Sequence, residues 1–201
     1  MATLGRVLDT GGYTPMQAPK RGRGYFAVGV ERLSKPKNAG NLFRTAHAFG
    51  ASFLFTIGAA YPRRRAHADT SRAPLHLPLY EFDGPDQLNL PEGCRLVGIE
   101  IVEGAIELPT FHHPLQAAYV LGPERGSLST PLLARCAHVV RIPTAFSLNI
   151  ATAGAIVLYD RLLAYGHYAR RPLSALGPPE TSPPHVRGAT KMRRRPPTEA
   201  A

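Results

Sequence analysis

The chain has 201 residues, of which 44% are hydrophobic and 19% charged, and 24 Lys and Arg against 14 Asp and Glu give a net charge of +10. The hydrophobic fraction excludes a chain that is disordered throughout, and the length predicts one domain of about 150 residues with extensions. No apolar run approaches the roughly 18 residues of a membrane-spanning helix, and no signal-peptide core begins the chain. We therefore expect a cytoplasmic protein without a membrane partner.

The remaining composition bears on metals and partners. Cys94 and Cys136 are the two cysteines, and their spacing fits neither a disulfide framework nor a zinc site, so we expect no metal. The basic balance favours polyanionic partners such as nucleic acid or an acidic membrane surface.

The positive charge is concentrated at the two ends of the chain. Residues 1–25 carry a net +3 and residues 170–201 a net +5, whereas residues 26–169 carry only +2. The C-terminal stretch also holds seven prolines and no aromatic residue. We therefore predict a basic arm at 1–24 and a flexible tail at 169–201, which either attracts RNA or keeps the protein in solution.

The middle of the chain, residues 25–168, alternates between short apolar runs and amphipathic segments. The apolar runs predict strands at 25–31, 51–57, 77–82, 95–102, 117–121 and 138–142. Helices are expected at 38–49, 130–136 and 148–166, with a short turn or helix near 83–90. Asn38 is the expected N-cap of the first helix and Gly50 its stop. Strands joined by crossover helices predict a single α/β domain with a mostly parallel sheet.

Four familiar patterns are absent or out of context. The letters of a dinucleotide-binding loop occur at 22–27, but they precede a strand instead of following one. The chain has no phosphate-binding P-loop and no serine-hydrolase elbow. His112 and His113 are adjacent, so their side chains diverge on any regular element and make a poor metal site.

Three segments combine glycine, proline and polar residues at expected element boundaries. The first contains Asn38, Gly40 and Arg44 at the start of the first helix, where the simplest interpretation of Arg44 is a solvated cation. The second, Tyr119–Ser129, ends a strand in a glycine-bearing turn. The third, Val140–Leu162, ends a strand at Ile-Pro and begins a helix near Ser-Leu-Asn, where a serine is often only an N-cap.

In this order and spacing, the three segments resemble the TrmH-like branch of the SPOUT RNA methyltransferases. The family motif N-x-G-x-x-x-R fits Asn38, Gly40 and Arg44, and the pattern L-G-x-E-x-x-G-L fits Leu121, Gly122, Glu124 and Leu128. The third motif, I-P followed by S-L-N, fits Ile142, Pro143, Ser147, Leu148 and Asn149. Two departures are a serine, Ser127, at the second glycine of the second motif and a shorter loop in the third. The resemblance covers residues 25 to 166.

The resemblance implies a fold and a cofactor. The family fold is one α/β domain with helices on both faces of the sheet and a C-terminal trefoil knot, which periodicity does not reveal. Its members are homodimers that bind S-adenosylmethionine in the knot and place the active site at the subunit interface. By this likeness Leu121, Gly122, Glu124, Ile142 and Leu148 are expected at the cofactor, although Ile142 and Leu148 also suit a core.

The resemblance also implies a reaction, the transfer of a methyl group to a ribose 2′-hydroxyl of tRNA or rRNA. Arg44 is then the catalytic residue, acting from the neighbouring subunit, while Asn38, Ser147 and Asn149 orient it or the ribose. Because arginine stays protonated in proteins, either its site is unusual or a phosphate or water takes the proton.

RNA contacts are expected from basic residues near the first two predicted strands. Arg63, Arg64 and Arg65 follow one strand, and Lys35 and Lys37 precede the first helix. A solvated loop is the plain alternative for the arginine run. At the level of function, two alternatives stay open: a non-catalytic RNA-binding or assembly protein, and a base methyltransferase on the same fold. The motifs do not encode which RNA is bound.

Overall fold

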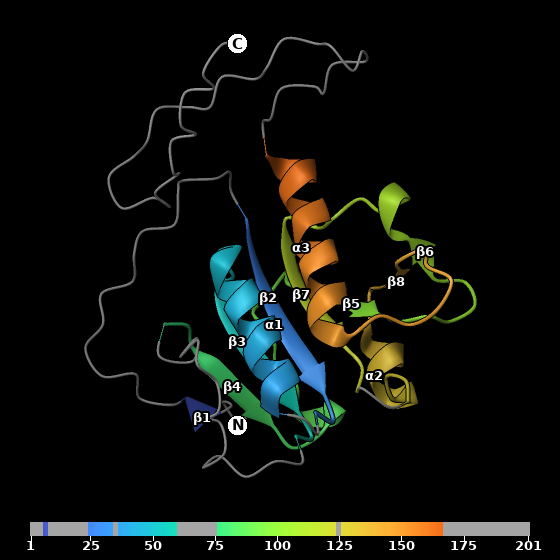
Figure 1. Cartoon of the computed structure of the whole chain (residues 1–201). Coiled ribbons are helices and arrows are strands. Elements are labelled where there is room, and N and C mark those ends of the chain that lie inside the picture. The colour runs from blue at the N-terminus through green and yellow to red at the C-terminus, as the bar shows by residue number, and fades with distance from the viewer. Residues whose placement is uncertain (1–5, 8–23, 34–35, 60–75, 124–125, 167–201) are drawn as a thin grey trace, which may run out of the picture. The chain divides into compact units, whose positions relative to one another are not determined.

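The computed structural model describes residues 6–7, 24–33, 36–59, 76–123 and 126–166 (Figure 1). All of them belong to one compact unit, residues 1–166. The predicted C-terminal tail, most of the N-terminal arm, Lys35, the arginine run at 63–65 and Glu124 lie outside the described residues.

The centre of the unit is an eight-stranded sheet in the order β1-β4-β3-β2-β7-β5-β8-β6. The strands are β1 (Arg6–Val7), β2 (Tyr25–Glu31), β3 (Phe53–Ile57), β4 (Leu79–Phe82), β5 (Arg95–Ile99), β6 (Ile106–Glu107), β7 (Gln116–Leu121) and β8 (His138–Arg141). Every neighbouring pair is parallel except β1 and β4. The predicted α/β class with a mostly parallel sheet is therefore confirmed.

Helices cover both faces of this sheet. They are α1 (Pro36–Ala48), α2 (Thr130–Arg135) and α3 (Ile150–Tyr165), with two short 3-10 helices, η3 (Pro85–Gln87) and η4 (Leu108–Thr110). Helices α1 and α3 lie side by side over one face (Figure 1) and share a hydrophobic core with it. Helix α2 packs against a second core on the opposite face. Central strands buried on both faces explain the continuous apolar runs of the sequence.

Two glycines allow the closest approaches in the core. The Phe55 ring occupies the space in which a side chain on Gly29 of β2 would lie, so the strand must carry glycine there. Leu42 of α1 in the same way fills the space beside Gly154 of α3. The first contact lets the Phe55 ring lie over β2, and the second lets α1 and α3 pack closely together.

The structure corrects several predicted boundaries. Helix α1 begins at Pro36, because proline suits the first turn of a helix, and Asn38 therefore lies inside that turn instead of capping it. Strand β5 ends at Ile99 instead of residue 102. The connection from β5 to β7 contains β6 and η4 but no α-helix; a left-handed Gly104 turns the chain there and prolines limit regular helix.

Candidate functional site

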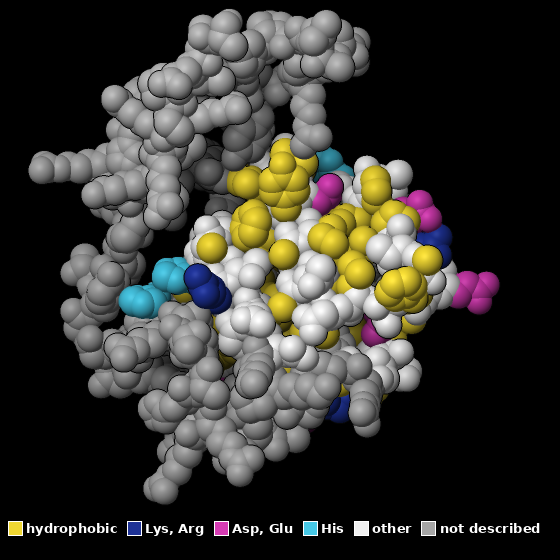
Figure 2. All heavy atoms as spheres, in the orientation of Figure 1, with side chains coloured by type: hydrophobic (Ala, Val, Ile, Leu, Met, Phe, Trp, Pro, Cys, Tyr) yellow, Lys and Arg dark blue, Asp and Glu magenta, His cyan; other side chains and the backbone are white. Residues whose placement is uncertain are grey.

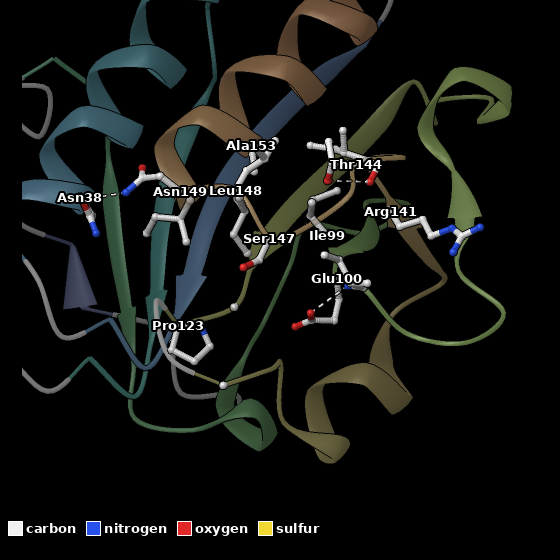
Figure 3. Close-up of a pocket in the computed structure, with 16 residues that line it drawn as sticks. Asn38, Ile99, Glu100, Pro123, Arg141, Thr144, Ser147, Leu148, Asn149 and Ala153 are labelled. Atoms are coloured by element: carbon white, nitrogen blue, oxygen red, sulfur yellow. Dashed lines mark hydrogen bonds between the residues drawn. The ribbon is translucent and has the colours of Figure 1, made fainter.

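A cavity of about 440 Å³ lies at the carboxyl ends of β5, β7 and β8 (Figure 3). It is lined by Asn38, Ile99, Glu100, Ile101, Leu121, Gly122, Pro123, Gly126, Arg141, Ile142, Thr144, Ser147, Leu148, Asn149, Ile150 and Ala153. Because parallel strands end at the same edge of a sheet, loops distant in sequence meet there. In Figure 3, Asn38, Leu148 and Asn149 lie on one side of Ser147, while Ile99, Glu100 and Arg141 lie on the other.

Two carboxylates, Glu31 and Glu100, hold the loop that follows β7, and we call them the carboxylate clamp. Glu100 accepts hydrogen bonds from the backbone N–H groups of Ile101 at 2.8 Å and Leu128 at 2.7 Å. Glu31, which is 2% exposed, accepts one from the Ser129 backbone at 2.7 Å and another from its hydroxyl. Because hydrogen bonds to a charged acceptor are the stronger kind, the clamp fixes this loop from both neighbouring strands.

The same loop leaves little space for a side chain at its first position. A methyl group on Gly122 would lie 3.1 Å from Oε2 of Glu100 and 3.2 Å from the Leu128 nitrogen. Gly126 has a φ of +104°, a backbone conformation that favours glycine. Close approach therefore explains the first glycine of the second motif, and turn geometry explains Gly126, which stands one place before the position of the motif's second glycine.

Asn149 connects the third motif with the first. Its side-chain oxygen accepts a hydrogen bond of 2.9 Å from the Ala151 N–H, which makes it the N-cap of α3. Its amide nitrogen donates to the side-chain oxygen of Asn38, on α1, at 3.3 Å (Figure 3). The N-cap is thus Asn149 rather than Ser147, whose exposed side chain borders the cavity.

The charged groups of the cavity come from Glu100 and Arg141. The guanidinium of Arg141 pairs with Glu107 at 2.7 Å, and both side chains are about half exposed. Such an exposed pair contributes about 1 kcal/mol or less to stability, so little opposes its opening toward a ligand.

Seven of the residues predicted from sequence line the cavity: Asn38, Leu121, Gly122, Ile142, Ser147, Leu148 and Asn149. Ile142 also packs against the core, so both of its expected environments occur together. Arg44 is exposed on α1 and is not among the lining residues. Lys37 lies in α1.

Sequence reasoning missed the part of the cavity that follows β5. Glu100 stands directly after β5, but the predicted strand ran through residue 102 and hid it inside a regular element. A charged residue at the end of an apolar run was the available indication. Arg141 was missed in the same way, at the end of β8.

Searches for two other kinds of feature gave negative results within the described part of the chain. No three His, Cys, Asp or Glu side chains there come together in a way that suits a metal ion. None of the helices described is both long and apolar enough to span a bilayer.

The fold and the cavity define a single α/β unit with a cavity of small-ligand size at the carboxyl edge of its sheet. The SpoU rRNA Methylase family matches residues 25–159, and the chain belongs to this family. The resemblance carried by the three motifs is therefore confirmed.

Relatives agree with this assignment. The chain is 28% identical over 138 residues to a mouse tRNA (guanosine(18)-2′-O)-methyltransferase, TARBP1, a match covering 64% of this chain and 9% of that protein. It is 28% identical over 149 residues to a 23S rRNA (uridine(2479)-2′-O)-methyltransferase of Streptomyces viridochromogenes, covering 68% and 52%. The chain thus spans about half or less of the length of these curated relatives.

A solved structure shares the fold. The methyltransferase AviRb of Streptomyces viridochromogenes, determined in complex with the cofactor AdoMet, superposes with a TM-score of 0.63 at 24% sequence identity. The match covers 74% of this chain and 62% of AviRb.

Proposed function

We propose that the protein is an S-adenosylmethionine-dependent RNA methyltransferase that methylates a ribose 2′-hydroxyl of tRNA or rRNA. The observation that carries the proposal is the cavity itself, because the second and third motifs of the family meet at its wall. The two curated relatives are named as ribose 2′-O-methyltransferases of a tRNA and an rRNA. The expected cytoplasmic location stays a prediction.

The cavity suits S-adenosylmethionine in size and chemistry. Its volume of about 440 Å³ falls within the range of about 300 to 1,000 Å³ that is typical of small-molecule sites. Leu121, Ile142 and Leu148 provide apolar walls for an adenine, and the strand-end loops offer backbone groups to its edge. Glu100 adds a negative group to the lining. When bound, the cofactor supplies a methyl group on a positively charged sulfur.

In this proposal the residues of the chain align the acceptor and stabilise its charge. Ser147 and Asn149 hold the ribose side of the cavity, and Asn38 keeps Asn149 in place through their hydrogen bond. Arg44 stabilises the negative charge that develops on the ribose oxygen. Since arginine stays protonated, the proton leaves to a phosphate oxygen or to water. Glu124, a residue of the second motif, is assigned to the cofactor site by the family resemblance.

A second copy of the chain completes this site. Arg44 is exposed on α1 and does not line the cavity of its own chain, which fits action in the cavity of a partner. Helix α3 carries an exposed apolar stripe of Ile156, Tyr159 and Leu163 at helical spacing, in a region where Figure 2 shows hydrophobic side chains. We assign this stripe to a homodimer interface.

The dimer is tested with Leu163→Glu and light scattering. We expect the wild-type protein to have twice the mass of the chain and the variant to be a monomer. Leu115→Glu, which adds a charge at another exposed leucine, is the control and should leave the dimer intact. A monomeric wild-type protein would contradict the proposed interface.

We also propose that the chain forms the trefoil knot of the family. The loops after β7 and β8 line one cavity, so the chain leading into α3 runs close to the loop after β7.

Contacts to RNA phosphates are proposed, on the basis of positive charge, for Lys35, Lys37, Arg63, Arg64 and Arg65.

The reaction is tested by incubating the purified protein with labelled S-adenosylmethionine and total tRNA or rRNA. We expect labelled RNA, and we expect Arg44→Ala to reduce transfer by about 10²- to 10³-fold, the usual effect of removing one stabilising donor. Cofactor affinity, measured by calorimetry, should not change. Arg95→Ala, at another exposed arginine, is the matched control. Full turnover by Arg44→Ala would remove this residue from the mechanism.

A further inference from the structure

Phe146 is the most exposed large hydrophobic residue of the described chain, at 77%. It lies in the loop between β8 and α3, where Thr144 and Ser147 on either side both line the cavity. The Phe146 ring is therefore exposed next to two cavity-lining residues and is not itself part of the lining.

The loop that carries Phe146 is held by its own hydrogen bonds. The Thr144 N–H donates to the Ile142 carbonyl at 2.8 Å, and the Thr144 hydroxyl donates to the Phe146 carbonyl at 2.9 Å. These bonds fix the backbone on both sides of residue 145. The exposure of the ring therefore follows from a defined turn, which keeps the side chain out of the core.

A second exposed apolar residue lies at the same cavity. Ile101 is 53% exposed, lines the cavity and belongs to the loop after β5. Strands β5 and β8 are neighbours, and the Glu100 N–H donates to the Val140 carbonyl at 3.0 Å just before the two loops begin. Ile101 thus lines the cavity from one loop, and Phe146 belongs to the adjacent loop, between two residues that line it.

We propose that Phe146 is a stacking surface for an unpaired nucleobase of the RNA substrate, with Ile101 as a second apolar contact. The proposal rests on the proposed function. In a nucleotide the 2′-carbon is bonded to the carbon that carries the base, so a ribose hydroxyl brought to the cavity places a base at its mouth. Every base has a π-face that stacks on an aromatic ring, whatever the sequence.

The surroundings of Phe146 favour a base over a protein partner. Thr144, Ser147 and Asn149 are all exposed polar residues of the same loop, so hydrogen-bonding groups lie close to the ring along the chain. A nucleobase has the matching form, with an apolar face and hydrogen-bonding edges. The continuous apolar surface that suits a second protein chain lies instead on α3.

The test compares binding of two short single-stranded RNAs of mixed sequence, one intact and one with abasic riboses in place of its nucleotides. Salt is set high enough to suppress contacts to phosphate. We expect the full-length protein to prefer the base-bearing RNA. Phe146→Ala should weaken that binding about 5- to 150-fold, since stacking contributes about 1 to 3 kcal/mol per base. Phe146→Tyr should keep the preference.

The controls separate this proposal from its alternatives. Leu115→Ala removes another exposed apolar side chain, 55% exposed, and should leave binding unchanged. Loss of cofactor affinity in Phe146→Ala would mean that the ring stacks on the cofactor, and loss of the dimer would assign it to the subunit interface; either result overturns the proposal. Equal binding of both RNAs by the wild-type protein also overturns it. The test needs no methyl transfer, so its outcome is independent of the activity assay.

Discussion

The two ends of α3 use polar side chains for different purposes. At its first turns, Asn149 and the loop before it open onto the cavity. Toward its last turns, Asp160 and Arg161 join His113 and Tyr119 in a group that we call the buried polar cluster. His113 and Tyr119 are each 1% exposed and Arg161 is 7% exposed. One end presents polar groups to the cavity, while the other uses them for hydrogen bonds within the chain.

The buried polar cluster ties α3 to the amino ends of β2 and β7. Arg161 donates to the carbonyls of Pro114 at 2.6 Å and Leu115 at 2.9 Å, and to the Tyr119 hydroxyl at 3.1 Å. His113 joins the Tyr119 hydroxyl at 2.6 Å and Asp160 at 2.9 Å. Burial raises the pKa of Tyr119 to about 12, so its hydroxyl stays protonated. Each atom named in these hydrogen bonds has a partner within the chain, as is typical of a network that stabilises a fold.

A buried polar group is not by itself a functional one. The cluster holds a histidine, an aspartate and an arginine, the side chains often sought in active sites. Its members form hydrogen bonds with one another and with backbone carbonyls, whereas the residues at the opposite end of α3 border a cavity. Changes at the two ends should therefore separate stability from ligand binding.

The largest effect is expected for Arg161→Met. The variant removes the charged donor of three hydrogen bonds, to the carbonyls of Pro114 and Leu115 and to the Tyr119 hydroxyl, so we expect the free energy of unfolding to fall by about 3 to 5 kcal/mol. Urea denaturation measures this change, and Arg95→Met at an exposed arginine is the control. If enough protein stays folded, its affinity for S-adenosylmethionine should be unchanged. A stable variant with weak cofactor binding would reverse the roles of the two ends.

The next effect is expected for Glu100→Gln at the carboxyl end. An amide cannot accept both backbone hydrogen bonds with the strength of a carboxylate, so the loop after β7 loosens. We expect cofactor affinity to fall about tenfold or more, because hydrogen bonds to charged groups contribute about 1.5 to 3 kcal/mol. Isothermal titration measures the affinity. Glu103→Gln, at an exposed position in the same connection, should bind like the wild-type protein.

A smaller effect is expected at Asn149, where capping and ligand contact coincide. Asn149→Ala should lower the free energy of unfolding by about 1 kcal/mol through loss of the N-cap. Asn149→Asp keeps a capping oxygen but loses the amide donor to Asn38, so we expect normal stability with reduced methyl transfer. Thermal unfolding and transfer rates are measured together. Equal activity of Asn149→Asp and the wild-type protein would show that the link to Asn38 has no part in function.

The smallest effect is a pH dependence of stability at the buried polar cluster. Burial lowers the pKa of His113 from 6.5, with Arg161 and His112 acting in the same direction and Asp160 opposing them. The folded state therefore disfavours the protonated ring. The stabilisation is fully present above pH 6.5 and is lost as the pH falls from there through the lowered pKa of the folded state.

This pH dependence is checked by urea denaturation of the wild-type protein and His113→Phe at several pH values. The loss of stability below pH 6.5 should be shallower in the variant. His47 also has a lowered pKa, because of burial and nearby His76, and contributes equally to both proteins. Parallel curves for the two proteins would show that His113 is not the titrating group.

Most of the sheet follows from local patterns in the sequence, and the cavity follows only in part. Apolar runs such as YFAVGVE of β2 mark buried parallel strands, because both faces of such a strand are covered. The ends of β5 and α1 were misplaced, since pairing with a neighbour and a proline in the first turn decide them. Glu31 and Glu100 were not expected to clamp one loop, because they lie 69 positions apart and meet only through strand order.

The buried polar cluster could not be predicted from the sequence either, because its members lie far apart along the chain. His113 was considered in the sequence only as half of a histidine pair, and its partner Asp160 is 47 positions away. No short-range spacing connects them, so only the packing of α3 against β7 reveals the network.

The central claim is that the carboxyl edge of the sheet transfers a methyl group to ribose. The most direct measurement is digestion to nucleosides and mass spectrometry of RNA incubated with the purified protein and isotopically labelled S-adenosylmethionine. We expect a labelled 2′-O-methylnucleoside that disappears with Arg44→Ala. A label found on a base, or no label from a protein that binds both cofactor and RNA, would contradict it.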